Sequence, residues 1–485
     1  MSSREIHVVV VGGSWAGVTA VRELIELSYL TYPGLHITLV EQRTHYFHKT
    51  GIIRGLADKK YAEQMFIPYN RLFSHGTSVA HNHRFVCARL KHVHEHFIEV
   101  EGGSRLFYDY LIIATGTEYK SLPVTSSVTA EECYAQYQAM RDAMEAADRI
   151  LFVGGGAVGI GLCGEIAEMY PKKTITLAHA RERLLNEDLS DNFASSTEAR
   201  LQKMGVKLVL GETVVPSEFG TELNPNVVSP PSPSIAPSLA GAKSIINSER
   251  KSRHIGAPSI APSIAYSTSQ SVVPSVFHRY TASISPSETS SLNSSDPISH
   301  RYRFQWNVRP HEVVTKRGQK IECDLAIWTT GSRPQTAFMK TLLPSNDKFP
   351  LVDAVSGSIS VRPTLQLADA RFPYIFAVGD VNSLSISEKY ATSAVNQAKQ
   401  AVGNIRALID DCYDFRIKMS AAMAANTAAK ANLLPYMGTK KGVVVALGRN
   451  QEVSNTFFAK INSWARGGKR GRKYLLDKAQ EMLNY

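Results

Sequence analysis

The stretch IHVVVVGGSWAG, residues 6–17, decides how the first part of this chain folds. Residues 6–11 form a short apolar, β-branched run, which is typical of a buried parallel strand. A glycine-rich turn follows at 12–17, and apolar residues recur at helical spacing over 18–30. A strand, a glycine turn and a helix in this order aim backbone N–H groups of a helix N-terminus at a phosphate group.

A second apolar run, 36–40, ends in Glu41, as a strand after this helix would. The dinucleotide pattern asks for glycine at its first, third and sixth places, and Gly12 and Gly17 occupy the first and the sixth. Ser14 holds the third place, where its hydroxyl can donate to a phosphate. A carboxylate at Glu41 can accept from both hydroxyls of an adenosine ribose. The pattern predicts a dinucleotide site; the alternative is a purely structural turn.

The same pattern returns about 140 residues later, with a strand at 149–153 and a helix at 160–170. Gly154, Gly156 and Gly159 satisfy the full glycine pattern. The next strand, 173–178, is followed by His179 and Arg181 instead of an acid. These two side chains could meet a 2′-phosphate, which would permit NADPH. The alternative is that Arg181 is a solvated surface charge.

Two such units predict an α/β fold with two Rossmann-like dinucleotide-binding domains, the first of them discontinuous. We expect this first domain at 1–122 and 323–396, and the second at 123–322. A small C-terminal α+β region with a basic tail takes up 397–485.

An insertion at 217–300 interrupts the second domain. Residues 229–297 contain 20 Ser and 9 Pro. Such a segment buries too little apolar surface to offset the entropy of ordering, so we expect it to be disordered.

Composition indicates the cellular compartment and the kinds of partner that this protein can have. The chain has 485 residues, a net charge of +11 and five cysteines without a CxxC pair. This pattern predicts a reducing compartment, with no disulfide framework and no metal site. No secretory signal and no apolar stretch of about 18 residues is present, so we expect a cytoplasmic protein. The positive charge favours nucleotides, anionic lipid headgroups or nucleic acid as partners.

Three further motifs complete a recognisable set: Ala114-Thr115-Gly116, Thr329-Thr330-Gly331, and Gly379-Asp380 after an apolar strand. Together with the two glycine turns they resemble the pyridine nucleotide-disulfide oxidoreductase superfamily of flavoproteins. The stretches around residues 46–49 and 66–69 are similar to its AMID branch. This branch comprises the apoptosis-inducing-factor-like quinone reductases and includes ferroptosis suppressor protein. No cysteine pair lies near residues 42–60, which argues against disulfide reductase chemistry.

The resemblance implies FAD as the cofactor and NADH or NADPH as the electron donor. It implies that Lys389 lies beside the flavin as a catalytic residue; a solvated lysine is the alternative. Gly161 occupies a place where the family usually has a glutamate near the nicotinamide. The implied cofactor-binding residues are Gly12, Gly13, Ser14, Trp15, Ala16, Gly17, Glu41, Arg54, Val86, Ala114, Thr115, Gly116, Gly154, Gly156, Gly159, Glu165, Arg181, Gly331 and Asp380.

The function implied is that of an FAD-dependent NAD(P)H:quinone oxidoreductase, with a quinone or another small molecule as electron acceptor. Two alternatives stay open: a non-enzymatic nucleic-acid-binding effector of the apoptosis-inducing-factor type, and a redox sensor with weak nucleotide turnover. No sequence-specific nucleic-acid motif supports the first. Basic residues at 466–473, preceded by aromatics at 457–464, suit an anionic membrane surface. The expected location is then the cytoplasm, in association with a membrane or with the mitochondrial surface, and a solvated charge run is the alternative.

Overall fold

A computed structural model describes most of the chain. The described residues are 5–73, 82–118, 122, 128–185, 189–215, 306, 308–343, 350–385, 389–421, 432–438, 444–448, 451–454 and 475–484. The predicted disordered insertion at 217–300 and the basic cluster at 466–473 lie outside these residues, so both stay predictions.

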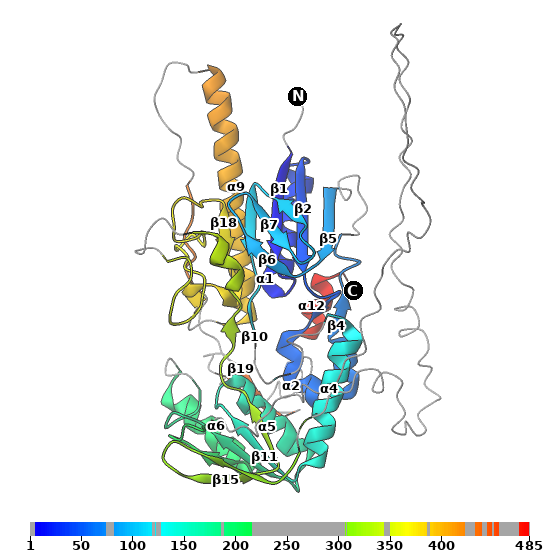
Figure 1. Cartoon of the computed structure of the whole chain (residues 1–485), viewed down its shortest axis with the longest axis vertical. Helices are drawn as coiled ribbons and strands as arrows, with labels where there is room; N and C mark the ends of the chain where they lie inside the picture. Colours follow the sequence, from blue (N-terminus) through cyan, green and yellow to red (C-terminus); the bar gives the residue numbers. More distant parts are fainter. Residues whose placement is uncertain are drawn as a thin grey trace, which may run out of the picture. The chain divides into compact units, whose positions relative to one another are not determined.

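The first sheet is parallel and has the strand order β18-β9-β1-β2-β5 (Figure 1). Its strands are β18 (Ile375–Ala377), β9 (Tyr110–Ile113), β1 (Ile6–Val11), β2 (Leu35–Glu41) and β5 (His83–Cys87). The residues of β1 and β2 are almost all buried, as their apolar sequences require. Because β18 returns from late in the chain to pair with β9, the prediction of a discontinuous first domain is confirmed.

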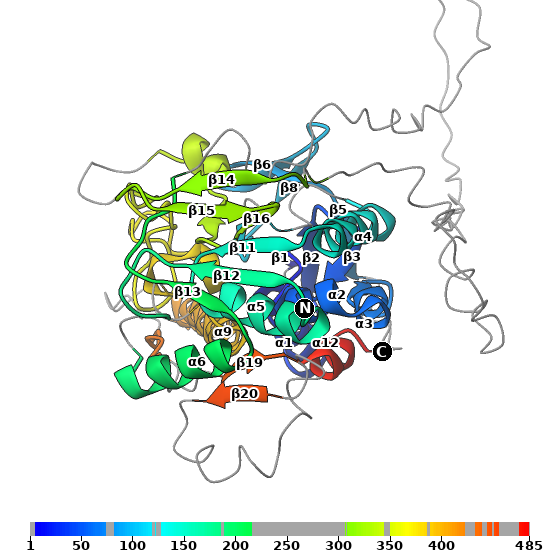
Figure 2. The ribbon, with the colours of Figure 1, turned by 90° about the horizontal axis from the view of Figure 1, so that it is seen from below.

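The second sheet repeats this arrangement with the order β13-β12-β11-β16 (Figure 2). Its strands are β13 (Lys207–Val209), β12 (Thr174–Ala178), β11 (Arg149–Val153) and β16 (Leu325–Trp328). The predicted domain boundary after residue 322 is wrong, because it assigned β16 to the first domain whereas β16 pairs with β11. A four-residue apolar run carries no signal for which of two sheets it joins. The other domain boundaries stay predictions.

Each glycine turn leads into a helix, α1 (Trp15–Leu30) in the first unit and α5 (Ala157–Met169) in the second. Helix α9 (Ala391–Ala421) packs against α1. Its buried Gln397 accepts from the backbone N–H of Gly379 at 2.8 Å, which fixes the turn after β18. The described residues contain no helix with both the length and the apolar character that a membrane crossing needs.

Smaller elements surround these two units. Strand β19 (Val444–Leu447) pairs with β20 (Gln451–Ser454) in an antiparallel hairpin, and β19 contacts α5. The remaining helices are α2 (Ile52–Ala57), α3 (Lys59–Gln64), α4 (Ala130–Ala146), α6 (Asp191–Lys203) and α12 (Leu476–Met482). The remaining strands are β3 (His45–Phe47), β4 (Phe66–Pro68), β6 (Leu90–Val93), β7 (Phe97–Val100), β8 (Arg105–Phe107), β10 (Thr117–Glu118), β14 (His311–Val314), β15 (Lys320–Cys323), β17 (Arg333–Pro334), β19 (Val444–Leu447) and β20 (Gln451–Ser454).

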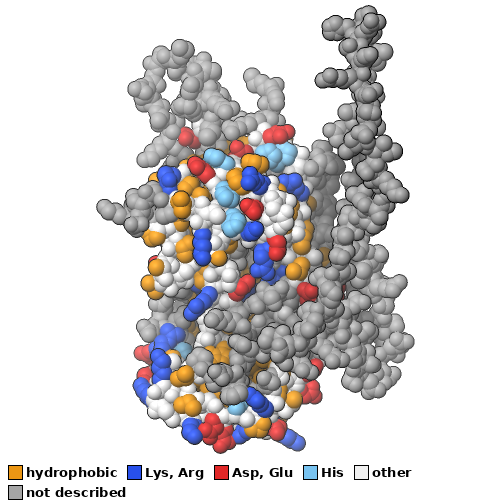
Figure 3. All heavy atoms as spheres, in the orientation of Figure 1, with side chains coloured by type: hydrophobic (Ala, Val, Ile, Leu, Met, Phe, Trp, Pro, Cys, Tyr) orange, Lys and Arg blue, Asp and Glu red, His pale blue; other side chains and the backbone are white. Residues whose placement is uncertain are grey.

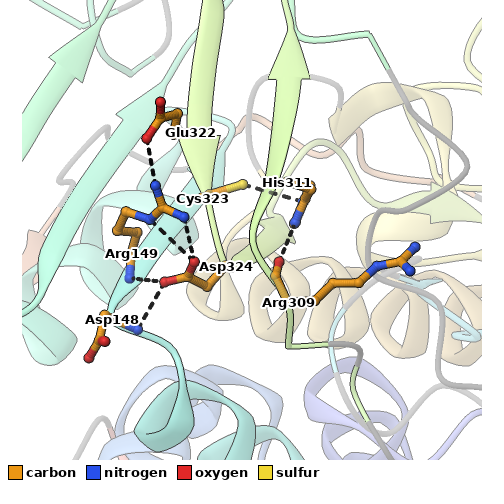
Figure 4. A network of polar contacts seen from close by, with 7 residues as sticks. All are labelled: Asp148, Arg149, Arg309, His311, Glu322, Cys323 and Asp324. Atoms are coloured by element: carbon orange, nitrogen blue, oxygen red, sulfur yellow. Dashed lines mark hydrogen bonds and ion pairs between the residues drawn. The ribbon is translucent and has the colours of Figure 1, made fainter.

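A charged cluster ties the start of β11 to the junction of β15 and β16 (Figure 4). Asp324 accepts from the side chain of Arg149 at 2.7 Å (Nη2) and 3.2 Å (Nε). It also accepts from the backbone N–H groups of Arg149 and Asp148 at 2.8 and 3.2 Å. These hydrogen bonds, with that of the Arg149 side chain first, lower the pKa of Asp324. The side chain of Asp324 is 12% exposed, whereas that of Glu322, which pairs with the same arginine, is 68% exposed.

Asp324→Asn should therefore lower the free energy of unfolding by about 1–3 kcal/mol at pH 7, because an amide group cannot accept all four hydrogen bonds. Glu322→Gln is the matched control, and its exposed pair should contribute little. A lowered native pKa means that Asp324 stabilises the fold above its unfolded pKa of about 4 and ceases to do so as the pH falls through the native pKa. The difference between wild type and Asp324→Asn, measured by urea unfolding, should shrink below about pH 4. Equal losses in the two variants would contradict this account.

Candidate functional site

The first glycine turn is shaped by two close backbone approaches. Gly12 has φ +103°, and a Cβ atom there would lie 2.3 Å from the carbonyl oxygen of Ala114. A Cβ atom at Gly17 would lie 1.7 Å from the carbonyl oxygen of Gly12. Neither position tolerates a side chain, so helix α1 packs directly onto the end of β1. The end of β9, which carries the predicted Ala114-Thr115-Gly116 motif, closes the other side of the turn.

Glu41 is buried against this turn. Its Oε2 accepts from the backbone N–H of Gly13 at 2.7 Å, and its Oε1 accepts from that of Arg43 at 3.1 Å. The hydroxyl of Tyr69 donates to the carbonyl oxygen of Gly13 at 2.5 Å. Burial raises the pKa of Tyr69, so this phenol keeps its proton. The predicted ribose acceptor is thus held in place, and Val86 lies on β5 beside it, since Cys87 is the strand partner of Glu41.

Two buried polar atoms around the turn lack a hydrogen-bond partner within the described protein. The buried atoms Trp15 Nε1 and Thr115 Oγ1 have no hydrogen-bond partner among the described residues. Ser14 begins α1, and its side chain makes no capping hydrogen bond. Buried donors without a partner cost free energy, which a bound group with acceptor oxygens would recover. These residues fit the phosphates of a dinucleotide.

A chain of polar contacts joins Asp380 to a residue that the sequence did not single out. The Oδ2 of Asp380 accepts from Thr117 Oγ1 at 3.5 Å. The Nζ of Lys49 donates to the carbonyl oxygen of Thr117 at 2.5 Å. Burial lowers the pKa of Lys49, as do the positive charges of Arg43 and Lys389, whereas the carboxylate of Asp380 opposes this shift. Lys49 stands in the 46–49 stretch that carried the family resemblance, but nothing in its spacing marked it as part of a site.

The second glycine turn repeats the packing of the first. Gly154 has φ +120°, and a Cβ atom at Gly159 would lie 2.0 Å from the carbonyl oxygen of Gly154 and 2.6 Å from Thr329 Oγ1. Thr329 donates through this hydroxyl to the carbonyl oxygen of Gly154 at 2.8 Å, just before Gly331 at φ +38°. At Gly156, in contrast, an added Cβ atom would meet nothing within 4 Å. The protein itself does not require a glycine there, whereas the close approach of a pyrophosphate would.

His179 takes the place that Glu41 has in the first unit. Its Nδ1 accepts from the backbone N–H of Gly155 at 3.0 Å. Burial and, secondly, the charge of Arg181 lower the pKa of His179 to about 4. The imidazole is therefore neutral near pH 7, and the second unit has no anion at the ribose position.

Two predicted cofactor ligands, Arg54 and Glu165, lie against each other. The guanidinium Nη2 of Arg54, on α2, is 2.6 Å from the Oε1 of Glu165, on α5, and the two side chains are only 4% and 1% exposed. The same Nη2 also donates to the carbonyl oxygen of Gly448 at 3.3 Å. This buried ion pair joins an element of the first unit to the helix that follows the second glycine turn. Contacts of either residue with a cofactor stay predictions.

Comparisons with known proteins agree with this geometry. Residues 6–223 match the model of the pyridine nucleotide-disulphide oxidoreductase family. Apoptosis-inducing factor homolog B of Dictyostelium discoideum is 26% identical over 245 residues, which are 48% of this chain and 58% of that protein. Ferroptosis suppressor protein 1 of Mus musculus is 27% identical over 43% of this chain and 53% of its own length. The chain thus aligns with little more than half the length of these curated relatives.

The first part of the chain is thus similar to the pyridine nucleotide-disulphide oxidoreductase superfamily. These curated relatives are apoptosis-inducing-factor homologues and ferroptosis suppressor proteins, which agrees with the branch that the resemblance implied. An FAD-dependent oxidoreductase of Flammulina velutipes is 22% identical over 80% of this chain and 90% of that protein. The sulfide:quinone oxidoreductase of Aquifex aeolicus shares the fold, with a TM-score of 0.54, 13% identity and coverage of 98% of this chain and 92% of that one. The prediction of FAD and NAD(P)H as cofactors is confirmed at the level of the family.

Gly156→Ala should lower the affinity for NAD(P)H about tenfold or more, because the new methyl group enters open space that the pyrophosphate would use. Its unfolding midpoint should stay that of the wild type. Gly159→Ala is the matched variant: its methyl group meets backbone atoms, so it should lose about 3 kcal/mol of stability or fail to fold. Isothermal titration with NADPH and thermal unfolding measure the two effects. Unchanged NAD(P)H affinity in Gly156→Ala would remove this glycine from the site.

Glu165→Gln should lower the free energy of unfolding by about 3–5 kcal/mol, because it leaves the guanidinium of Arg54 buried without its counter-charge. The double variant Arg54→Met/Glu165→Met should lose much less, since two apolar side chains replace the pair. Urea unfolding of Arg54→Met, Glu165→Met and the double variant gives the coupling energy. If the losses of unfolding free energy in the single variants add up to the loss in the double variant, the ion pair does not couple Arg54 to Glu165.

Proposed function

We propose that this protein is an FAD-dependent NAD(P)H:quinone oxidoreductase. The observation that carries the proposal is the duplicated glycine turn, with a carboxylate beside the first copy and a neutral imidazole beside the second. The first copy suits the adenosine ribose of FAD and the second suits NADH or NADPH. When bound, FAD would supply the redox chemistry, a two-electron transfer from NAD(P)H to a quinone in which one proton is taken up from solvent.

Lys389 and Lys49 are the residues that we propose to act electrostatically. Their charges interact, since Lys389 lowers the pKa of Lys49. Lys49 is linked through Thr117 to Asp380, the residue that the resemblance assigns to the flavin's ribityl chain or pyrophosphate. Two ammonium groups in a partly buried site stabilise negative charge that develops beside them. In this proposal Asp380 and Thr117 orient Lys49.

Two observations support a quinone as the electron acceptor: the sequence lacks a redox-active cysteine pair, and its curated relatives are apoptosis-inducing-factor-like proteins. The sequence has no CxxC pair that could take electrons from a flavin as a dithiol. A small two-electron acceptor must then come from outside, and a quinone suits the apoptosis-inducing-factor-like branch. On the face shown in Figure 3, Lys and Arg side chains are interspersed with Asp and Glu among the described residues, unlike the single-sign surface that nucleic acid favours. A peripheral contact of the basic cluster with an anionic membrane stays a prediction.

A visible spectrum followed by anaerobic reduction tests the proposal. The purified protein should show bands near about 370 and 450 nm, and NADPH or NADH should bleach the longer-wavelength band. A short-chain quinone should then restore the absorbance. Lys389→Met and Lys49→Met should keep the yellow colour but be bleached about tenfold more slowly or worse.

Two outcomes would refute this function. One is a correctly folded protein that stays colourless after incubation with FAD. The other is a yellow protein that neither nucleotide bleaches.

A further inference from the structure

Helix α12 (Leu476–Met482), from the C-terminal part of the chain, lies beside helix α1 of the first unit (Figure 1, Figure 2). The helix and the residue after it bury Leu476, Ala479 and Leu483, which are 3%, 0% and 0% exposed and recur at helical spacing. All three belong to the hydrophobic core that also contains the buried face of α1. A distant part of the sequence thus completes the core around the helix that follows the first glycine turn.

Polar contacts fix the end of α12 on α1. The Nη1 of Arg22 donates to the carbonyl oxygen of Glu481 at 2.8 Å. One turn earlier on α1, Thr19 Oγ1 donates to the Sδ of Met482 at 3.6 Å. The side chain of Arg22 is exposed, whereas Thr19 is buried. The docked helix is therefore held by an apolar face and by hydrogen bonds at its C-terminal end.

A further contact reaches the residues that shape the first glycine turn. The Nδ2 of Asn484 donates to the carbonyl oxygen of Arg71 at 3.0 Å. Arg71 is two residues after Tyr69, whose hydroxyl donates to the carbonyl oxygen of Gly13 at 2.5 Å. The segment of α12 thus contacts both the helix that begins at the glycine turn and the turn whose tyrosine holds Gly13.

The sequence of α12 does not make this helix stable by itself. It has seven residues, and isolated helices of this length do not persist in water. Its N-cap, Leu475, has φ +64° and makes no side-chain capping hydrogen bond. A left-handed backbone is unfavourable for leucine, because its Cβ atom approaches a neighbouring carbonyl oxygen. Helix α12 therefore keeps this form because it is docked on α1.

We propose that α12 is a latch for the first glycine turn. In the docked state it stiffens this turn through α1 and through Tyr69; in the released state the turn opens more often and FAD is lost more easily. Burial of three apolar side chains favours the docked state, and relief of the left-handed backbone favours the released state. The inference goes beyond the proposed reaction and rests on it only in that the first turn holds FAD. Because α12 acts through other elements, its residues are positioning residues.

Hydrogen exchange of the full-length protein tests the latch without turnover. Ala479→Asp places a carboxylate in the buried face and should release α12. Lys478→Asp introduces the same side chain at the exposed neighbouring position and is the matched control. In Ala479→Asp, the amides of residues 12–18 and 66–72 should exchange about tenfold faster than in the wild type in the same cofactor state. The amides of the second glycine turn, residues 154–160, should exchange at the wild-type rate.

Loss of FAD after dilution is the second measurement, followed by the fluorescence of the free flavin. The dissociation rate should rise about tenfold in Ala479→Asp and stay that of the wild type in Lys478→Asp. Arg22→Ala removes only the hydrogen bond to Glu481 and should cause a smaller rise in both measurements. If Ala479→Asp does not fold, Arg22→Ala decides the question.

The outcomes separate the latch from the reductase function. Unchanged exchange in the first turn of the released variants overturns the latch, as does an equal rise in both turns, which would show a general loss of stability. A protein that shows the expected exchange but never binds FAD supports the latch and refutes the reductase. A protein that NADPH bleaches normally, and whose first turn exchanges alike in all variants, overturns the latch and leaves the reductase standing.

Discussion

Both dinucleotide-type units depend on one close contact. In each of them, a glycine in the first turn of a helix lies directly against the carbonyl oxygen of the glycine that ends the preceding strand. A Cβ atom at Gly17 would come within 1.7 Å of the oxygen of Gly12, and one at Gly159 within 2.0 Å of the oxygen of Gly154. Only a hydrogen atom fits these places, so the helix N-terminus reaches the edge of the sheet. There its unpaired N–H groups can meet a phosphate. In both units the neighbouring parallel strand ends beside this contact, at Ala114 in the first unit and at Thr329 in the second.

One scaffold therefore serves two chemistries, and single side chains at equivalent places set the difference. The turn N–H finds an acceptor in each unit, a carboxylate of Glu41 in one and the Nδ1 of His179 in the other. Both side chains accept the hydrogen bond from the turn N–H. Only Glu41 also presents a negative charge to a ribose. Burial removes the charge that a histidine could carry, since it lowers the pKa of His179 to about 4. The two units thus differ in the charge that they carry at this place and not in the backbone hydrogen bond that they make there.

The parts of this structure that the sequence predicts are local in the chain. Gly12 to Glu41 and Gly154 to Ala178 each lie within one strand-turn-helix-strand segment, and their periodicity and spacing are enough to predict the fold class. The parts that it does not predict join distant residues. Thr117 and Asp380 are 263 positions apart, and Arg54 and Gly448 are 394 apart. Neither Lys49 nor the sheet to which β16 belongs leaves a periodic signal, because both are decided by tertiary packing.

The ion pair between Arg54 and Glu165 also bears on the departure at Gly161. Residues 161 and 165 are one helical turn apart on α5, so a carboxylate at 165 is the nearest replacement for one missing at 161. The Oε1 of Glu165 lies 2.6 Å from Arg54, in a site where its separation from that charge would cost several kcal/mol. A nicotinamide that contacted Glu165 would therefore share this carboxylate with the guanidinium of Arg54. The carboxylate one helical turn from Gly161 is held by a side chain of α2, so the packing of α2 against α5 determines the surroundings of the helix that follows the second glycine turn.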